Sequence, residues 1–328
     1  MAAPVYVPRL RRRSRLVPGV RRAVEPIREA RGFAKAMLWT GAGITFFFVV
    51  IAVFARLISP YKFDQYQSGG HRFPQLEHPS GEHIMGTTVQ SVDVLSRVIY
   101  GSQTELKVVL LALIFSLSIG VPVGLVSGYI GGALDRVLVL VMDALFAFPY
   151  LLLAVVIAFL LSGAVGSGIF TAAIAITVVY IPQYFRVVRN HVISVREEPY
   201  VEAARALGAK PATIMRRYVF FNVVQNVPVI ATLNAADAIL TLAGLGFLGY
   251  GIQPNEAAEW GYDIQRAVSD ATSGIWWTGL FPGLAIVLLV TGLTLLGEGL
   301  NETINPVLRR RRIEKVELSP LIDAAEGL

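Results

Sequence analysis

The chain has 328 residues, of which 54% are hydrophobic and only 16% are charged, and its formal net charge is +6. A soluble domain carries about 25% charged residues, and a single hydrophobic core stops growing near this chain length. Lipid is therefore expected to cover much of the apolar surface, which excludes an ordinary soluble protein. The chain contains no cysteine, so disulfides and thiolate metal sites are excluded as well.

Six stretches are long and apolar enough to cross a membrane, because a bilayer core of about 30 Å takes about 20 helical residues. Each stretch is predicted to be a helix, since backbone polar groups find no water partner in hydrocarbon. The first follows a basic segment, but its apolar run exceeds the roughly 7–15 residues of a cleavable signal, so it is expected to be a retained anchor. The predicted spans are 38–58, 106–130, 137–162, 168–188, 219–249 and 279–300.

Lysine and arginine are unevenly distributed around these spans. Residues 1–37, Arg136, the segment 186–217 and the tail beyond residue 305 hold 23 of the 29 basic residues. Basic residues gather on the cytoplasmic side of membrane proteins, so both termini are predicted to be cytoplasmic. We interpret the basic runs as charges that flank the membrane and contact anionic lipid, with no nucleic-acid partner.

These observations predict an all-α polytopic membrane protein with a defined order of parts. That order is a basic cytoplasmic N-terminal tail (1–37), a first transmembrane helix (38–58), an extracytoplasmic loop (59–104), a five-helix core (105–305) with a cytoplasmic loop at 190–217, and a basic cytoplasmic C-terminal tail (306–328).

The connection between the fourth and fifth spans is predicted to form a short helical hairpin. Pro199 suits the first position of a helix, where its missing N–H costs nothing. Glu197 and Glu198 precede it, at the end of the helix that favours anions. Gly208 suits the left-handed conformation that ends a helix, and a second helix is expected to start at Pro211 and run into the fifth span.

Glu202-Ala203-Ala204, followed by three residues and then Gly208, resembles the EAA loop of ABC-importer permeases. In that family the short helix lies in a cleft of a separate ATPase and couples closure of the ATPase to opening of the pore. The small alanines allow close approach, the glutamate offers a charged contact and the glycine permits the turn. The resemblance implies a set of ATPase-coupling residues: Pro199, Glu202, Ala203, Ala204, Arg205 and Gly208.

From about His78 to Arg309 the chain resembles the shorter permease of dipeptide and oligopeptide importers, the DppC/OppC type. The matching segments include HPSGEHIMGTTVQSVDVLSRVIYG (78–101), GVPVGLVSGYIGG (120–132), MDALFAFPYLLLA (142–154), LGFLGYGIQP (245–254) and LLGEGLNETINPVLR (295–309). The resemblance implies the six-span MetI-like core of a type I ABC importer in a bacterial cell membrane. It also implies a second permease of the DppB/OppB type, two ATPase subunits and an extracytoplasmic solute-binding protein.

Three positions depart from the pattern of that family. The family pattern GTDxxGRDVLSR corresponds to residues 86–97, where this chain lacks the first aspartate and the Gly-Arg pair of the pattern. The Leu-Pro-Asn that usually follows the coupling helices is replaced by Phe220-Phe221-Asn222, and a frequent glutamate of the fifth span is replaced by Leu242.

Ionisable and amide side chains inside the spans are candidates for the translocation path, because burying them in a membrane is costly. Asp143 lies just before Pro149 in the third span, where the family match suggests a hydrogen-bonding role near a gate, with solute contact as the alternative. Asn234 and Asp237 are three residues apart in the fifth span and are expected to share one face, at the seam between permeases or in the pore. Four prolines are expected to kink the spans that hold them: Pro122, Pro149, Pro182 and Pro228.

The sequence contains no phosphate-binding loop of the GxxxxGK[ST] type and no GxSxG or HExxH motif, so the chain is not expected to be an enzyme. ATP is expected to be hydrolysed by partner subunits, and no cofactor is implied. His71, His78 and His83 have no metal-site spacing, and no metal is predicted. Nickel and glutathione stay open as alternative substrates, because importers of these solutes use similar permeases. A stand-alone secondary transporter is the alternative class, but it would be expected to show internal repeats.

Overall fold

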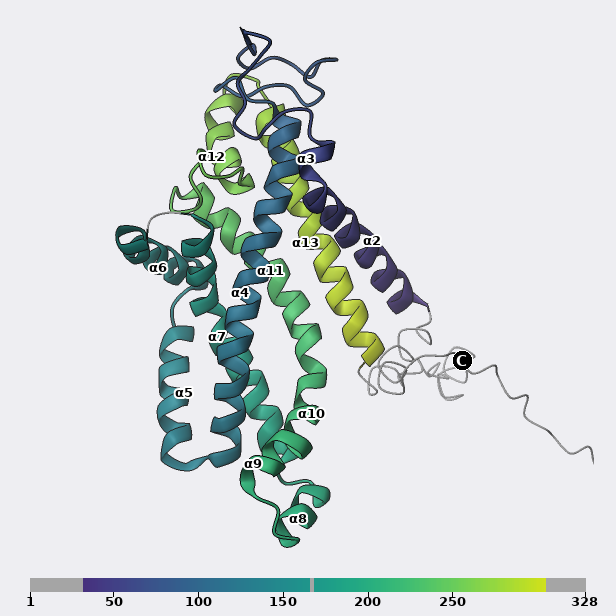
Figure 1. The fold of residues 1–328 in the computed structure, drawn as a ribbon, viewed down its shortest axis with the longest axis vertical. Coiled ribbons are helices and arrows are strands. Elements are labelled where there is room, and N and C mark those ends of the chain that lie inside the picture. Colours follow the sequence, from purple (N-terminus) through teal and green to yellow (C-terminus); the bar gives the residue numbers. More distant parts are fainter. Residues whose placement is uncertain (1–31, 166–167, 305–328) are drawn as a thin grey trace, which may run out of the picture.

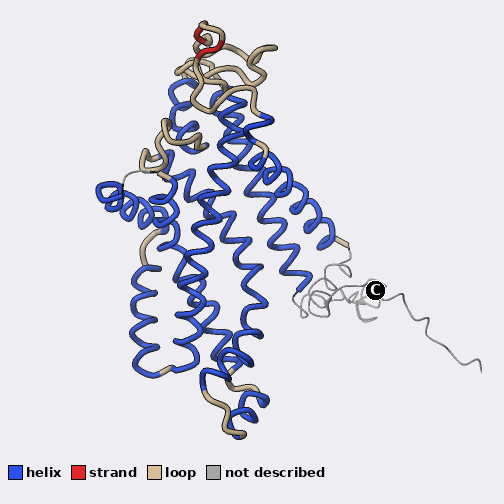
Figure 2. Tube along the Cα trace, in the orientation of Figure 1, coloured by secondary structure: helices blue, strands red, loops and turns tan. Residues whose placement is uncertain are grey.

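The computed structural model describes residues 32–165 and 168–304. Long helices run side by side along the longest axis of the molecule (Figures 1 and 2), and one small two-stranded sheet lies at one end. The longer helices are α2 (Phe33–Val53), α4 (Val94–Ile130), α5 (Gly132–Phe146), α6 (Tyr150–Val165), α7 (Ile169–Val195), α11 (Val227–Phe247), α12 (Trp260–Ala271) and α13 (Trp277–Ile304). The short elements are α3 (Ala55–Ile58), α8 (Pro199–Ala206), α9 (Pro211–Ile214), α10 (Phe220–Val223), β1 (Gln67–Ser68) and β2 (His71–Arg72).

The predicted third span, 137–162, is wrong as one continuous helix. It consists of α5 and α6, which are bent by 94° relative to each other. Pro149 lies in the break; it has no N–H to donate, and it disfavours helical backbone at Phe148 before it. Within the described residues, five helices are long and apolar enough to cross a membrane, and there are six if the bent pair counts as one span.

The predicted fifth span, 219–249, is also interrupted. A π-helical segment (Met215–Val219), α10 and a 3-10 turn (Val224–Asn226) precede α11, so the regular helix begins only at Val227. Pro228 is the second residue of α11, where its missing N–H costs nothing. Pro122 and Pro182, by contrast, lie inside α4 and α7.

The second span begins earlier than expected. α4 starts at Val94 and not near residue 106, because Asp93 caps it: its Oδ2 accepts a hydrogen bond from the Ser96 N–H at 2.7 Å. The loop predicted over 59–104 is therefore shorter, and residues 59–93 form a separate cap at one end of the bundle. Glu105, expected at the edge of the core, lies well inside α4.

The contact between α4 and α7 is the most extensive in the bundle. Three glycines recur at every fourth position along α4: Gly120, Gly124 and Gly128. A Cβ at Gly124 would lie 2.7 Å from the carbonyl oxygen of Phe185, and one at Gly128 would lie 2.8 Å from that of Arg189. Small residues at this spacing let two helix backbones approach closely, which drives helix packing in membranes.

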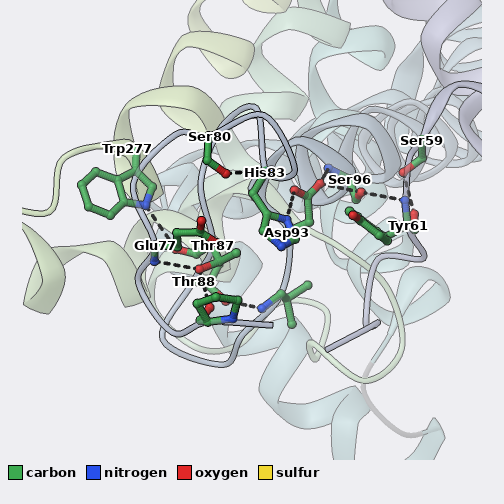
Figure 3. Close-up of polar contacts among 12 residues, drawn as sticks. Ser59, Tyr61, Glu77, Ser80, His83, Thr87, Thr88, Asp93, Ser96 and Trp277 are labelled. Atoms are coloured by element: carbon green, nitrogen blue, oxygen red, sulfur yellow. Dashed lines mark hydrogen bonds and ion pairs between the residues drawn. The ribbon is translucent and has the colours of Figure 1, made fainter. Parts of the chain in front are cut away.

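The cap is fastened to two helices by buried polar side chains (Figure 3). His83 Nδ1 contacts Asp93 Oδ1 at 2.9 Å, and both side chains are almost fully buried. The Trp277 indole N–H of α13 donates to the Thr87 carbonyl oxygen at 3.1 Å. The N–H of Tyr61 donates to Ser96 Oγ at 3.2 Å. Because buried polar groups are costly to leave unpaired, these bonds fix the position of the cap over α4 and α13.

Candidate functional site

The sequence that leads from α7 to α11 folds as the predicted hairpin. α8 begins at Pro199 and ends at Ala206, and Gly208 follows it with a φ of +77°. The Gly208 and Ala209 N–H groups donate to the carbonyl oxygens of Arg205 and Ala204, both at 3.0 Å. α9 then starts at Pro211, as expected. A left-handed glycine with these two bonds reverses the chain within a few residues.

α8 lies at the end of the molecule opposite the cap (Figure 1). Val201 and Ala204 face inward and pack against Val188, Val192 and Ile214. The other five residues predicted to couple to an ATPase are exposed: Pro199, Glu202, Ala203, Arg205 and Gly208. The outward face of α8 thus carries one acidic and one basic residue on either side of a small residue, which suits close contact with another protein.

Leu207 is a candidate contact that the sequence analysis missed. Its side chain is 89% exposed directly before the left-handed Gly208, although leucine is usually buried. The signal was present in the sequence, because the residue that ends a helix before a turning glycine is carried to the tip of the hairpin. A single exposed leucine is common on protein surfaces, but this one caps α8 in the turn toward α9, next to the charged residues of α8.

The elbow between α5 and α6 forms one wall of a cavity of about 290 Å³. α7 and α11 form the other walls, and Pro149 and Asp237 lie in the same cavity. The remaining lining is aromatic and aliphatic apart from Gln183, and its aromatic residues include Phe146, Phe148 and Tyr150. The structure therefore brings together two of the four residues that the sequence predicted for the translocation path.

The other two predicted path residues lie elsewhere. Asp143 is exposed on α5 and pairs with Arg186 of α7 at 2.9 Å, and the Arg186 guanidinium lies 4.2 Å from the centre of the Phe146 ring. Asn234 is only 4% exposed and lies beside the Tyr184 hydroxyl inside the bundle. Asn234 is therefore buried and Asp237 is exposed, and of the two only Asp237 lines the cavity.

A pair of buried carboxyl groups was not foreseen. Glu105 of α4 and Glu259, which caps α12, are both fully buried and lie next to each other. Glu259 accepts hydrogen bonds from the N–H groups of Gly261 and Tyr262, both at 2.7 Å. Burial raises the pKa of Glu259 to about 7. The second span predicted from the sequence begins at residue 106, after Glu105, and no helix was expected at α12. The contact between Glu105 and Glu259 could therefore not be predicted.

A second buried pair joins the same two helices. Arg97 of α4 contacts Asp263 of α12, with Nε–Oδ1 and Nη2–Oδ1 distances of 2.7 and 2.6 Å. Burial raises the pKa of Asp263, and the guanidinium acts in the opposite direction. Together, the two pairs anchor α12 against α4 below the cap.

The histidines of the cap do not form a cluster of ligands. His83 is bound to Asp93, and His78 stacks on Trp277 with ring centres 4.3 Å apart. In residues 32–165 and 168–304, no group of three or more histidine, aspartate or glutamate side chains is arranged to hold a metal ion.

The comparisons with known proteins agree with this arrangement. Residues 120–310 match the family described as "Binding-protein-dependent transport system inner membrane component". The dipeptide transport permease DppC of Alkalihalophilus pseudofirmus is 36% identical over 88% of this chain and 92% of its own length. The glutathione transport permease GsiD of Pectobacterium atrosepticum is 32% identical over 85% of this chain and 90% of its own.

A solved structure shares the fold. A chain of the MetNI methionine ABC transporter in an inward-facing conformation superposes with a TM-score of 0.52 and 21% identity, covering 64% of this chain and 96% of that chain. The expected MetI-like core is thereby confirmed. Permeases of this kind carry no ATPase of their own, and separate ATPase subunits and a binding protein complete the importer. This chain therefore belongs to the family of binding-protein-dependent inner-membrane transport components and is the permease subunit of a bacterial ABC importer.

Proposed function

We propose that this permease imports dipeptides or short oligopeptides and that α8 is the element through which the ATPases drive it. The observation that carries the coupling role is the outward face of α8, where Glu202, Ala203 and Arg205 are exposed beside the left-handed Gly208. A short rigid helix held by one buried face can transmit the closure of a docked domain as a rigid-body movement. The similarity to the DppC permease supports a peptide as the solute.

The complete importer, in this proposal, contains a second permease of the DppB/OppB type, two ATPase subunits and an extracytoplasmic solute-binding protein. Both termini and the α8–α9 hairpin face the cytoplasm, and the cap faces outward. The support is the charge distribution along the sequence, because 23 of the 29 basic residues lie in segments that are predicted to be cytoplasmic. The cap, with its fastened loops, is then the surface presented to the binding protein.

Glutathione is the second candidate solute, since the GsiD permeases are nearly as similar to this chain as DppC is. Glutathione is itself a small peptide, so the same path could serve both. Nickel is less well supported as the solute. Divalent metals prefer several polar ligands, whereas the cavity at the α5–α6 elbow has one carboxylate and a mainly aromatic and aliphatic lining.

The test is uptake by the whole complex, co-expressed with its genomic partners and reconstituted in liposomes with its binding protein and ATP. A labelled dipeptide, a labelled tetrapeptide, glutathione and Ni²⁺ are compared. ATP-dependent uptake of a peptide is the expected result. Uptake of glutathione alone would replace the peptide assignment, and uptake by the isolated chain without ATPases would overturn the coupling role.

A further inference from the structure

The cavity at the α5–α6 elbow has an unusual feature, which is a carboxylate without a cation. Asp237 of α11 lines it together with Tyr180 of α7 and Tyr150 of α6. Among the described residues, no lysine, arginine or histidine forms an ion pair with Asp237, and no hydrogen bond to its carboxylate is formed. Its backbone carbonyl, by contrast, accepts the Thr241 hydroxyl at 2.9 Å.

The polar groups around Asp237 already have partners of their own or carry no charge. The Tyr180 hydroxyl lies 3.2 Å from Thr241 Oγ1, and Gln183 is neutral. The nearest cation on α7 is Arg186, three residues beyond Gln183, and it is held by Asp143 and by the Phe146 ring. An unpaired carboxylate inside a membrane protein is costly and marks a functional site by default. Within the described residues of this chain the positive charge is missing, so a ligand can supply it.

The shape and lining of the cavity indicate which kind of cation fits. A volume of about 290 Å³ is at the small end of ligand pockets and suits a group the size of one or two amino acids. Aromatic rings from the elbow and from α7 line the same cavity as the carboxylate, and the faces of such rings attract organic ammonium groups. Metal ions such as Ca²⁺ take six to eight oxygen ligands, whereas the cavity offers one carboxylate.

We propose that this cavity is a subsite on the translocation path that binds the protonated amino group of the solute, with Asp237 as its counter-ion. The proposal rests on the proposed function, since it places the subsite in a permease for peptides with a free amino terminus. Asp237 is exposed at the open side of the cavity, so an ammonium group can enter without unfolding of the bundle. The elbow at Pro149 supplies one wall of the cavity.

The experiment measures equilibrium binding of labelled dialanine and of N-acetyl-dialanine to the purified complex in lipid nanodiscs, without the binding protein. Acetylation removes the positive charge and keeps the rest of the solute. The wild type is expected to bind dialanine at least tenfold more tightly than the acetylated compound. Asp237→Asn is expected to lose this preference, and Asp237→Glu, which keeps the charge, is expected to retain part of it.

Asp64→Asn is the matched control, because Asp64 is an exposed aspartate in the cap, far from the cavity. It is expected to bind like the wild type. Equal binding of both compounds by the wild type, or a preference that Asp237→Asn leaves intact, would overturn the subsite even if peptide uptake is normal. A complex that imports a different solute and no peptide would overturn the proposed function, and an unchanged dialanine preference in such a complex would still support an ammonium site.

Discussion

The guanidinium of Arg189 on α7 donates two hydrogen bonds to the carboxylate of Asp135 on α5, from Nε at 2.6 Å and from Nη2 at 2.7 Å. The Ser127 hydroxyl of α4 adds a third bond to the same carboxylate at 2.6 Å. Seven residues further along α7, Arg196 donates to the Gly128 carbonyl oxygen at 2.9 Å. The turn between α4 and α5 is therefore clamped to the part of α7 that leads into α8. Through this clamp, a movement of the hairpin is expected to reach α5 and the elbow that forms one wall of the cavity.

Breaking this clamp is expected to uncouple transport. Arg189→Gln removes a charged contact that consists of two hydrogen bonds to Asp135. Because hydrogen bonds to charged groups contribute about 1.5–3 kcal/mol, we expect the free energy of unfolding to fall by about 2 kcal/mol. Stimulation of ATP hydrolysis by the loaded binding protein is expected to fall severalfold, while basal hydrolysis persists. Glu197→Gln is the control, because Glu197 is 71% exposed and its pair with Arg196 contributes little. Equal effects of the two variants would contradict the clamp.

The turn of the hairpin can be tested with two glycines in the same backbone conformation. Gly208 has a φ of +77° and Gly274, which follows α12, has a φ of +79°; an added Cβ meets no atom within 4 Å at either position. Valine costs a similar amount of backbone strain at both, about 1–2 kcal/mol. Gly208→Val is expected to abolish stimulated ATP hydrolysis and uptake, and Gly274→Val to leave both near the wild-type level. Membrane insertion, followed by yield and gel filtration, is expected to be normal for both. Retained uptake in Gly208→Val would remove the coupling assignment.

The buried carboxyl pair predicts a dependence of stability on pH. Burial raises the pKa of Glu259 from 4.5 to about 7, so between these values the folded protein binds more protons at this site than the unfolded chain does. The free energy of unfolding is therefore expected to fall as the pH rises from about 5 to about 7, and Glu259 contributes roughly 3 kcal/mol to this fall. Thermal unfolding in detergent across this range measures the slope.

Glu105→Gln is expected to flatten this slope. Glutamine removes the neighbouring carboxyl group and can donate an N–H to the Glu259 carboxylate, so the variant should be more stable than the wild type at about pH 8 and similar to it at about pH 5. Glu82→Gln in the exposed part of the cap is the matched control and should keep the wild-type slope. A slope that Glu105→Gln leaves unchanged would place its origin in another group.

The absence of native cysteine makes the orientation directly measurable. Leu207→Cys puts a thiol at the tip of the hairpin, where the side chain is 89% exposed, and Ile84→Cys puts one in the cap, where it is 61% exposed. In intact cells, a membrane-impermeant maleimide is expected to label the second variant and to label the first only after lysis. The reverse pattern would place the α8–α9 hairpin outside the cell and overturn the proposed coupling.

The hairpin could be predicted in detail from the sequence because single residues determine its ends. Pro199 fits only the first turn of a helix, and Gly208 readily takes the left-handed conformation, whatever the rest of the fold is. The break at Pro149 could not be placed from hydropathy, since the residues on both sides of it are equally apolar. Pro149 predicts a kink in the third span, but the size of the bend, 94°, depends on how α6 packs against α7.

The pairing of Glu105 with Glu259 lay beyond the sequence for a different reason. It depends on α4 extending past its apolar stretch and on α12 folding back over it, and both are set by tertiary contacts. α12 has only twelve residues and an amphipathic pattern, so it reads as a loop in a search for spans. The difference in burial between Asn234 and Asp237 has the same cause, because spacing fixes the angle between two side chains but not which neighbour each one meets.

The backbone between α9 and α11 changes from α-helix to π-helix, back to α-helix, then to a 3-10 turn, all within residues 211–226. These forms differ in the number of residues per turn, so the segment can exchange one pattern of backbone bonds for another while staying coiled. A displacement of Gly208 would then reach Asp237 partly as a change in the number of residues per helical turn. The movement that the ATPases impose on the hairpin would therefore not be transmitted to the cavity as a purely rigid shift.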